Sequence, residues 1–157
     1  MDMKRRKDGF TIVEIAFVTG IIGLLAAMGS YAIMVAVANS RQKTVDIELS
    51  MISTATLQLA WDTGRWPNQA SLKSPGSTEI WNISPSSAGL TGENSAFSDW
   101  KGPYYDGETV DPWGNPYFFD PDYRINGVNH IAVGSFGPNG QGRNVYDDDD
   151  IYVLLDD

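Results

Sequence analysis

Carboxylates stand at two places in this sequence where a carboxylate needs a partner. Glu14 is the only charged residue between positions 10 and 38. A carboxylate in a segment that enters a membrane costs roughly 2.5–3.5 kcal/mol on insertion scales, so it is normally paired. Four consecutive aspartates occupy positions 147–150, and their like charges repel one another. An ion pair would stabilise Glu14, and a bound cation would stabilise the aspartates.

The partner of Glu14 can come from cleavage of the chain itself. A cut between Gly9 and Phe10 would give Phe10 a free α-amino group and would make Glu14 the fifth residue. Within one helix the Glu14 side chain lies away from that amine, so the amine of a neighbouring subunit is the natural partner. These residues therefore predict processing followed by lateral assembly.

The aspartate run lies between two expected strands, at residues 130–136 and 151–155, where the chain must be ordered. Calcium accepts roughly six to eight oxygen ligands in flexible geometry, whereas magnesium requires a strict octahedron and retains its waters. We therefore expect calcium here, with a metal-free polar loop as the alternative. The D-x-D-x-D-G spacing of an EF-hand is absent.

Composition excludes several other kinds of chemistry. The 157-residue chain has no Cys, a single His (His130) and a net charge of −9. The sequence therefore excludes thiol catalysis, Cys-ligated metal centres and multi-histidine sites, and its acidity argues against nucleic-acid binding. No G-x-S-x-G, P-loop or H-E-x-x-H string occurs, so we expect a protein that is not an enzyme.

One long helix is expected to position Glu14. Residues 10–38 are almost wholly apolar or small, and this length exceeds the roughly 20 residues that cross a bilayer. An amphipathic pattern follows without a break, and Gly64 with Pro67 predicts the helix end, so the helix is expected over about residues 11–62. The apolar stripe of its second half has three- and four-residue spacing and consists of Val45, Leu49, Ile52, Thr56 and Leu59.

We expect an α+β fold, in which the amphipathic half of this helix packs on a small antiparallel β-sheet. Strands are expected at residues 117–119, 130–136 and 151–155, and a variable loop at residues 71–99. The expected parts of the chain are a cleaved basic leader (1–9), a transmembrane and assembly half of the helix (10–38), its amphipathic half (39–63) and a C-terminal globular domain (64–157).

The string KDGFTIVEI at residues 7–15 resembles the prepilin signature, in which a basic leader and Gly precede Phe, Thr, two aliphatic residues and Glu. This signature is shared by type IV pilins and by the pseudopilins of type II secretion. The resemblance implies cleavage between Gly9 and Phe10 by a prepilin peptidase of the inner membrane, followed by N-methylation of Phe10. It also implies a role for Glu14 in filament assembly.

Three further strings resemble the major pseudopilins in chain order, namely DTGRWP (62–67), WKGPY (100–104) and DPWGNPY (111–117). Residues 136–140 and 149–151 resemble the two parts of the calcium loop of that family. One departure is an Asn where the family usually has Asp, which removes one charge from the expected site. The calcium ligands that the resemblance implies are the Phe136 carbonyl, Asn139, Asp149 and Asp150, with Asp147 as a further ligand.

The sequence therefore predicts a structural subunit of a pseudopilus that serves type II protein secretion. Its expected partners are further copies in a helical filament, other pseudopilins, the prepilin peptidase, the inner-membrane assembly platform and, before assembly, membrane lipid. We expect a single-pass protein of the bacterial inner membrane with its C-terminal domain in the periplasm. One alternative is a type IV pilin or minor pilin of a surface pilus. An alternative of another class is a secreted carbohydrate-binding module, released by cleavage before Asn39.

Overall fold

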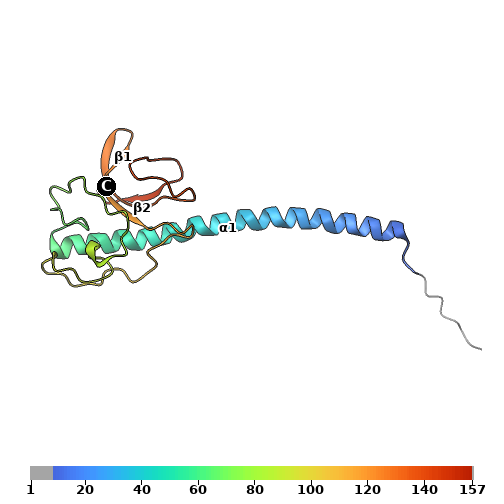
Figure 1. Cartoon of the computed structure of the whole chain (residues 1–157), viewed down its shortest axis with the longest axis horizontal. Helices are drawn as coiled ribbons and strands as arrows, with labels where there is room; N and C mark the ends of the chain where they lie inside the picture. Colours follow the sequence, from blue (N-terminus) through green and yellow to red (C-terminus); the bar gives the residue numbers. More distant parts are fainter. Residues whose placement is uncertain (1–8, 157) are drawn as a thin grey trace, which may run out of the picture. The chain divides into compact units, whose positions relative to one another are not determined.

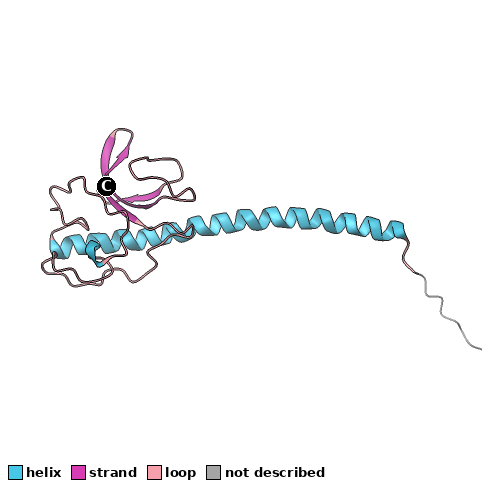
Figure 2. Cartoon of the chain, viewed as in Figure 1, coloured by secondary structure: helices cyan, strands magenta, loops and turns pink. Residues whose placement is uncertain are grey.

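The computed structural model describes residues 9–156, so the basic residues of the leader lie outside the described part of the chain. One long helix and one three-stranded antiparallel sheet confirm the predicted α+β fold (Figure 1; Figure 2). The chain divides after Ser40 into two compact units, which are described separately below. The elements are α1 (Ile12–Thr63), the short 3-10 helix η1 (Ser86–Ala88), β1 (Phe118–Ile125), β2 (Val128–Ser135) and β3 (Ile151–Leu154).

Both ends of α1 have the capping contacts that the sequence provides. The Thr11 hydroxyl accepts a hydrogen bond from the Glu14 backbone N–H at 3.2 Å, and the Glu14 carboxylate accepts one from the Thr11 N–H at 2.8 Å. This reciprocal pair is a capping box. At the other end Gly64 has a φ of +69°, and its N–H donates to the Ala60 carbonyl at 2.9 Å. The helix predicted at residues 11–62 is therefore confirmed to within one residue at each end.

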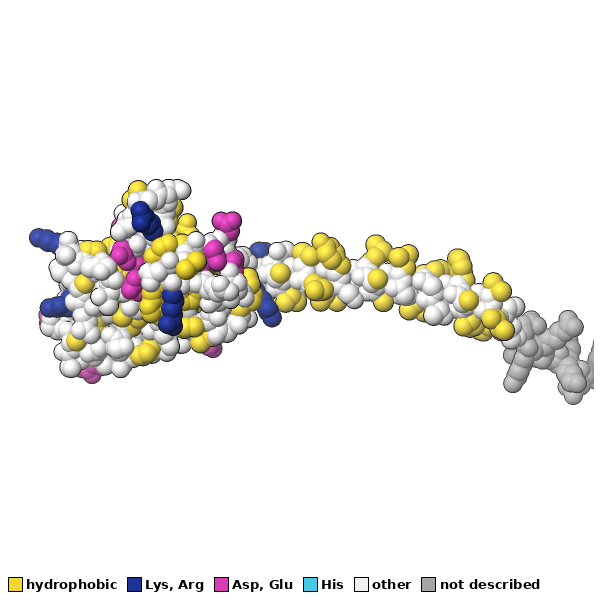
Figure 3. Space-filling model, turned by 45° about the horizontal axis from the view of Figure 1, so that its top comes forward, with side chains coloured by type: hydrophobic (Ala, Val, Ile, Leu, Met, Phe, Trp, Pro, Cys, Tyr) yellow, Lys and Arg dark blue, Asp and Glu magenta, His cyan; other side chains and the backbone are white. Residues whose placement is uncertain are grey.

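The first unit contains the apolar half of α1. Its large side chains are exposed, including Phe10, Leu24 and Tyr31 at 84%, 63% and 73%. Figure 3 shows hydrophobic side chains along this segment. By length and composition, α1 contains a stretch that is apolar enough to cross a membrane. An apolar surface of this extent requires lipid or protein around it.

The core of the second unit lies between the amphipathic half of α1 and the sheet. All five predicted stripe residues are fully buried, which confirms the expected packing face. The four aliphatic members of the stripe share one cluster with the aromatic side chains of Trp66, Tyr117 and Phe119. Beside this cluster, the Tyr117 hydroxyl donates a hydrogen bond to the Glu48 carboxylate. Burial of each aliphatic stripe residue contributes roughly 1.5–3 kcal/mol and so fixes the helix on the sheet.

The sheet has the order β1-β2-β3, and both pairings are antiparallel. Phe119 in β1 pairs with Val133 in β2, which pairs with Val153 in β3. Asn126 and Gly127 connect β1 to β2, and both have the positive φ that a tight two-residue hairpin requires. All three predicted strands are therefore present.

Strand β1 is longer than predicted, because it continues past residue 119 to Ile125. The added part of the strand contains Pro121 between two aspartates. In the structure a register shift between Asp120 and Tyr123 accommodates Pro121, which cannot donate to the ladder. Pairing then resumes at Tyr123 opposite His130.

Candidate functional site

Three of the predicted calcium ligands lie together around Asn139. The Asn139 side-chain N–H groups donate to Asp147 Oδ2 at 2.9 Å and to Asp149 Oδ1 at 2.7 Å. The Asn139 backbone N–H donates to the other Asp149 oxygen at 3.1 Å. The Asn139 hydrogen bond is the main cause that lowers the pKa of Asp147, because it favours the charged form. In this arrangement Asn139 is a hydrogen-bond donor to the carboxylates, and its side-chain oxygen faces elsewhere.

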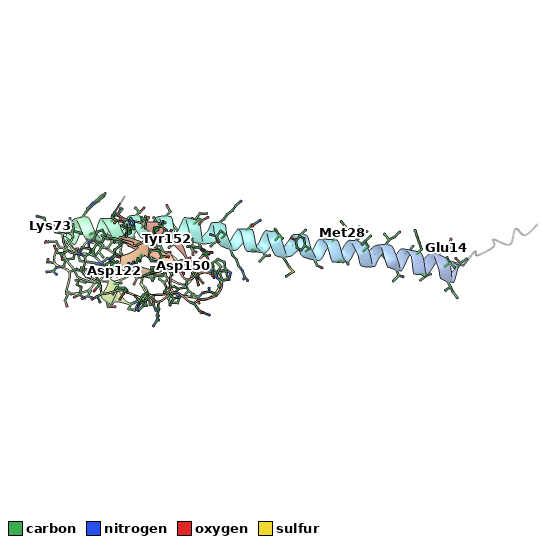
Figure 4. The ribbon with its side chains drawn as sticks, turned by 90° about the horizontal axis from the view of Figure 1, so that it is seen from above. Glu14, Met28, Lys73, Asp122, Asp150 and Tyr152 are labelled. Atoms are coloured by element: carbon green, nitrogen blue, oxygen red, sulfur yellow. The ribbon has the colours of Figure 1, made fainter. Side chains whose placement is uncertain are left out.

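Asp150, the residue before β3, is labelled in Figure 4; it is 9% exposed, and its backbone N–H donates to the Asp147 carbonyl at 3.3 Å. Its Oδ2 accepts a hydrogen bond from the Tyr123 hydroxyl at 3.0 Å. Its Oδ1 is buried and has no hydrogen-bond partner in the described part of the chain. Burial raises the pKa of Asp150 to about 6. A buried carboxylate oxygen without a partner is a position where a cation would be stabilising.

Phe136 and Gly137 join the end of β2 to this loop. The Phe136 ring stacks on Phe118 at a centroid distance of 4.6 Å, so its backbone is held against the sheet. Gly137 has a φ of +59°, and a Cβ there would collide with the backbone carbonyl of Asp149. This close approach requires glycine, and it brings the two halves of the loop together.

The DPWGNPY string forms a turn that holds the start of the same loop. Asp111 is buried, and its Oδ2 accepts a hydrogen bond from the Ser135 hydroxyl at 2.5 Å. The Ser135 hydroxyl oxygen accepts from the Gly137 N–H at 3.0 Å, and the Asn115 side chain donates to the Gly137 carbonyl at 2.7 Å. The other Asp111 oxygen accepts from the N–H groups of Trp113 and Asn115. This turn therefore positions the loop, which spacing alone did not indicate.

The other two family strings also meet in space. Asp62, at the end of α1, accepts hydrogen bonds from Lys101 at 3.0 Å and from the Tyr104 hydroxyl at 3.1 Å. The Trp100 indole donates to the Gly89 carbonyl at 2.8 Å. These contacts give the DTGRWP and WKGPY strings a structural role. The Trp100 indole is part of the fold of the domain.

A second carboxylate group was not predicted from the sequence. Oxygen atoms of Glu79, Asp120 and Asp122 lie within 4.8 Å of one another. Among the described residues, the predicted calcium ligands Asp147, Asp149 and Asp150 do not form a group this close. Asp120 is fully buried, and its oxygens accept hydrogen bonds from the Asp122 N–H and the Tyr146 hydroxyl. Burial raises the pKa of Asp120 to about 6. Because Glu79 lies about 40 residues before the other two, no local sequence signal could have found this group.

The predicted assembly residues lie at the start of α1. Gly9 and Phe10 are exposed and precede the helix, and Glu14 is labelled near its first turn in Figure 4. The Glu14 carboxylate also accepts a hydrogen bond from the Thr11 hydroxyl at 2.9 Å. The capping box thus gives Glu14 a partner in its own chain, although that partner carries no charge.

His130 lies on β2, the central strand of the sheet. Its Nδ1 lies 3.5 Å from Asp156 Oδ2, and the other Asp156 oxygen accepts from the Ile131 N–H at 3.2 Å. These contacts fix Asp156 beside β2. His130 is therefore accounted for without a catalytic role.

The comparison with protein families matches this arrangement of strings. The family described as type II secretion system (T2SS), protein G, matches residues 32–153, well over half of the chain. Comparisons with curated proteins and with solved structures gave no match. The matched range contains the amphipathic half of α1, the turn at 111–117 and the acidic loop. This chain belongs to the type II secretion system protein G family, the major pseudopilins, and is a membrane-anchored structural subunit with a C-terminal domain.

Proposed function

We propose that this chain is the repeating subunit of a pseudopilus, assembled from the inner membrane with its C-terminal domain in the periplasm. The observation that supports this most directly is the exposed apolar half of α1, in which Glu14 is the only charged residue. Before assembly, lipid surrounds this segment. In the filament, the corresponding segments of other copies replace the lipid. The assembly platform and other pseudopilins are the remaining partners.

Assembly would follow processing between Gly9 and Phe10. The exposed position of both residues, before the first turn of α1, is compatible with access by a prepilin peptidase. Cleavage removes the basic leader and creates an amine on Phe10, which is then methylated. A methylated amine keeps its positive charge and remains able to pair with a carboxylate.

The Glu14 carboxylate of one subunit would then pair with the Phe10 amine of its neighbour. In the chain described here, Glu14 is satisfied by neutral donors from Thr11 alone. A charged donor is stronger than a neutral one, so the amine of a neighbour offers Glu14 a better partner within the apolar filament core. The pair would also fix the register between adjacent helices.

Two variants separate the ion pair from the capping box. Glu14→Gln keeps a carbonyl oxygen for the Thr11 N–H but removes the charge, whereas Thr11→Ala keeps the charge and removes the hydroxyl of the cap. Electron microscopy of pseudopili, with N-terminal mass analysis as the processing control, is expected to show few filaments from processed Glu14→Gln and near-normal filaments from Thr11→Ala. Normal filaments from Glu14→Gln would contradict the proposed pairing.

We further propose that the acidic loop binds calcium. The chemistry of the site supports this, because each candidate ligand carries an oxygen atom that calcium can use and the buried Asp150 Oδ1 has no hydrogen-bond partner among the described residues. The residues that would hold the ion are the Phe136 carbonyl, Asn139, Asp147, Asp149 and Asp150. Bound calcium would neutralise the carboxylates of the loop.

Asn139 would have to change its role on ion binding. Its amide nitrogen now faces Asp147 and Asp149, and its oxygen accepts from the Gln141 N–H at 2.6 Å. Rotation of the amide by half a turn would bring the oxygen to the carboxylates as a neutral ligand. That rotation loses hydrogen bonds, so we expect weaker calcium binding than an aspartate at this position would give.

A further inference from the structure

The hydrogen bonds of Asn139 suggest a role that does not require a metal. Both N–H bonds of the side-chain amide are used, one by Asp147 and one by Asp149. The side-chain oxygen is used by the Gln141 N–H. These partners define the orientation of the amide, because a carboxylate accepts and a backbone N–H donates. The side chain is thus placed between the two carboxylates as a bidentate donor.

This donor holds together parts of the loop that are far apart along the chain. Asn139 follows the end of β2, whereas Asp149 lies two residues before β3 begins. The Asn139 backbone N–H adds a third bond to Asp149, at 3.1 Å. Asp147 is connected to the same end, since one of its oxygens accepts from the Asp149 N–H at 3.2 Å. These hydrogen bonds join the two ends of the loop.

An aspartate at position 139 would reverse this effect. It would present two oxygen atoms to the two carboxylates in place of two N–H donors, and three like charges would meet without compensation. A cation bound between the three carboxylates would remove this repulsion. The choice between an amide and a carboxylate at this one position therefore decides whether closure needs a metal.

We propose that the Asn139 amide closes the acidic loop in the absence of a cation, so that the C-terminal domain folds completely without calcium. This inference goes beyond the proposed filament role and does not depend on it. It also differs from the calcium proposal, because here calcium adds stability to a loop that is already closed. The same fold would then persist in environments that are poor in calcium.

Arg143 provides a local reporter of closure, because it lies within the loop and is exposed. Trypsin cleaves after Arg143 when the loop opens, at a rate that follows the open population if closing is fast. The experiment uses the full-length chain in detergent micelles, digested briefly in EDTA or in calcium chloride. Mass spectrometry then measures the cleavage after Arg143 separately from cleavage elsewhere, which would report global unfolding.

The variants are Asn139→Asp, Asn139→Ala and, as a control of equal charge in the same loop, Gln141→Glu. In EDTA, we expect Asn139→Asp to be cleaved after Arg143 roughly tenfold faster than wild type, from the loss of at least one charge-assisted hydrogen bond. Calcium is expected to restore protection to Asn139→Asp but not to Asn139→Ala. Gln141→Glu is expected to match wild type in both buffers, which also controls for protease activity.

Two results would overturn the inference. One is wild-type chain that is cleaved as fast as Asn139→Asp in EDTA, because its loop would then be open without the ion. In the second, Asn139→Asp in EDTA resists trypsin cleavage after Arg143 as well as wild type does. A wild-type chain that is protected in EDTA and unaffected by calcium would support the inference while contradicting the calcium proposal. None of these readouts depends on filament formation.

Discussion

Replacement of Ser135 by alanine tests whether the turn at 111–117 positions the acidic loop. Ser135 is fully buried, and its hydroxyl donates to Asp111 Oδ2 at 2.5 Å while its oxygen accepts from the Gly137 N–H at 3.0 Å. Alanine fits the same space but removes both contacts. One oxygen of the buried Asp111 carboxylate then loses its donor, and the Gly137 N–H loses its acceptor.

The size of the effect follows from these two losses. A hydrogen bond to a charged group contributes roughly 1.5–3 kcal/mol, and leaving a buried partner unsatisfied costs a comparable amount. Relaxation of the loop and entry of water reduce the total, so we expect the free energy of unfolding to fall by about 2–3 kcal/mol. For a chain of this length, that corresponds to a decrease of roughly 4–12 °C in melting temperature.

The measurement is thermal unfolding of the full-length chain in detergent, followed by near-ultraviolet circular dichroism. Ser98→Ala is the matched control, because Ser98 is exposed. It should change the free energy of unfolding by no more than about 0.5 kcal/mol. A double-mutant cycle with Asp111→Asn then isolates the coupling between the two residues. A Ser135→Ala variant as stable as the control would refute the positioning role of the turn.

Three further predictions concern the core, the buried carboxylates and the metal. Leu49→Ala, at a fully buried position of α1, should lower the free energy of unfolding by about 2–5 kcal/mol. Ile47→Ala is the control, because Ile47 is 62% exposed, and it should have little effect. If the two variants lost similar amounts of stability, the assigned packing face of α1 would be wrong. Burial raises the pKa of Asp120 to about 6, whereas the pKa of an aspartate in an unfolded chain is about 3.9. The folded state therefore binds a proton on Asp120 more tightly than the unfolded state does. The stability that this proton contributes is fully present below about pH 4 and is lost as the pH rises through about 6. Asp120→Asn should therefore flatten the fall in melting temperature between pH 4 and 6, and an unchanged slope would count against a buried, proton-binding Asp120. Calcium at about 100 times its Kd should raise the free energy of unfolding of wild type by roughly 2.7 kcal/mol, and that of Asp150→Asn by much less. If calcium raised the free energy of unfolding of both proteins equally, Asp150 would be excluded as a ligand.

The helix and the sheet could be predicted from the sequence because their signals are local. The stripe from Val45 to Leu59 repeats with the helical period, and all of its members are buried in the structure. The full length of β1 has no such local signal, because a proline is compatible with a strand end and the chain instead forms a bulge at Pro121. Whether a bulge forms depends on pairing with β2, and that is not encoded near the proline.

The contacts between distant strings could not be predicted, since each depends on tertiary packing. The DPWGNPY turn indicates its own conformation but not its bonds to Ser135 and Gly137. Asn139 was expected to supply an oxygen ligand, but in the structure its nitrogen faces the carboxylates. The capping box at the start of α1, in contrast, has a local signal, namely the Thr-x-x-Glu spacing at residues 11–14.

Processing by the pseudopilin pathway is tested most directly by the intact mass and the N-terminal sequence of protein purified from host membranes. We expect a chain that begins at Phe10 and carries one added methyl group. A chain beginning at Asn39 would indicate a soluble secreted product, and an uncut chain beginning at Met1 would indicate a plain membrane anchor. Either of these results would contradict the processing and the assembly proposed here.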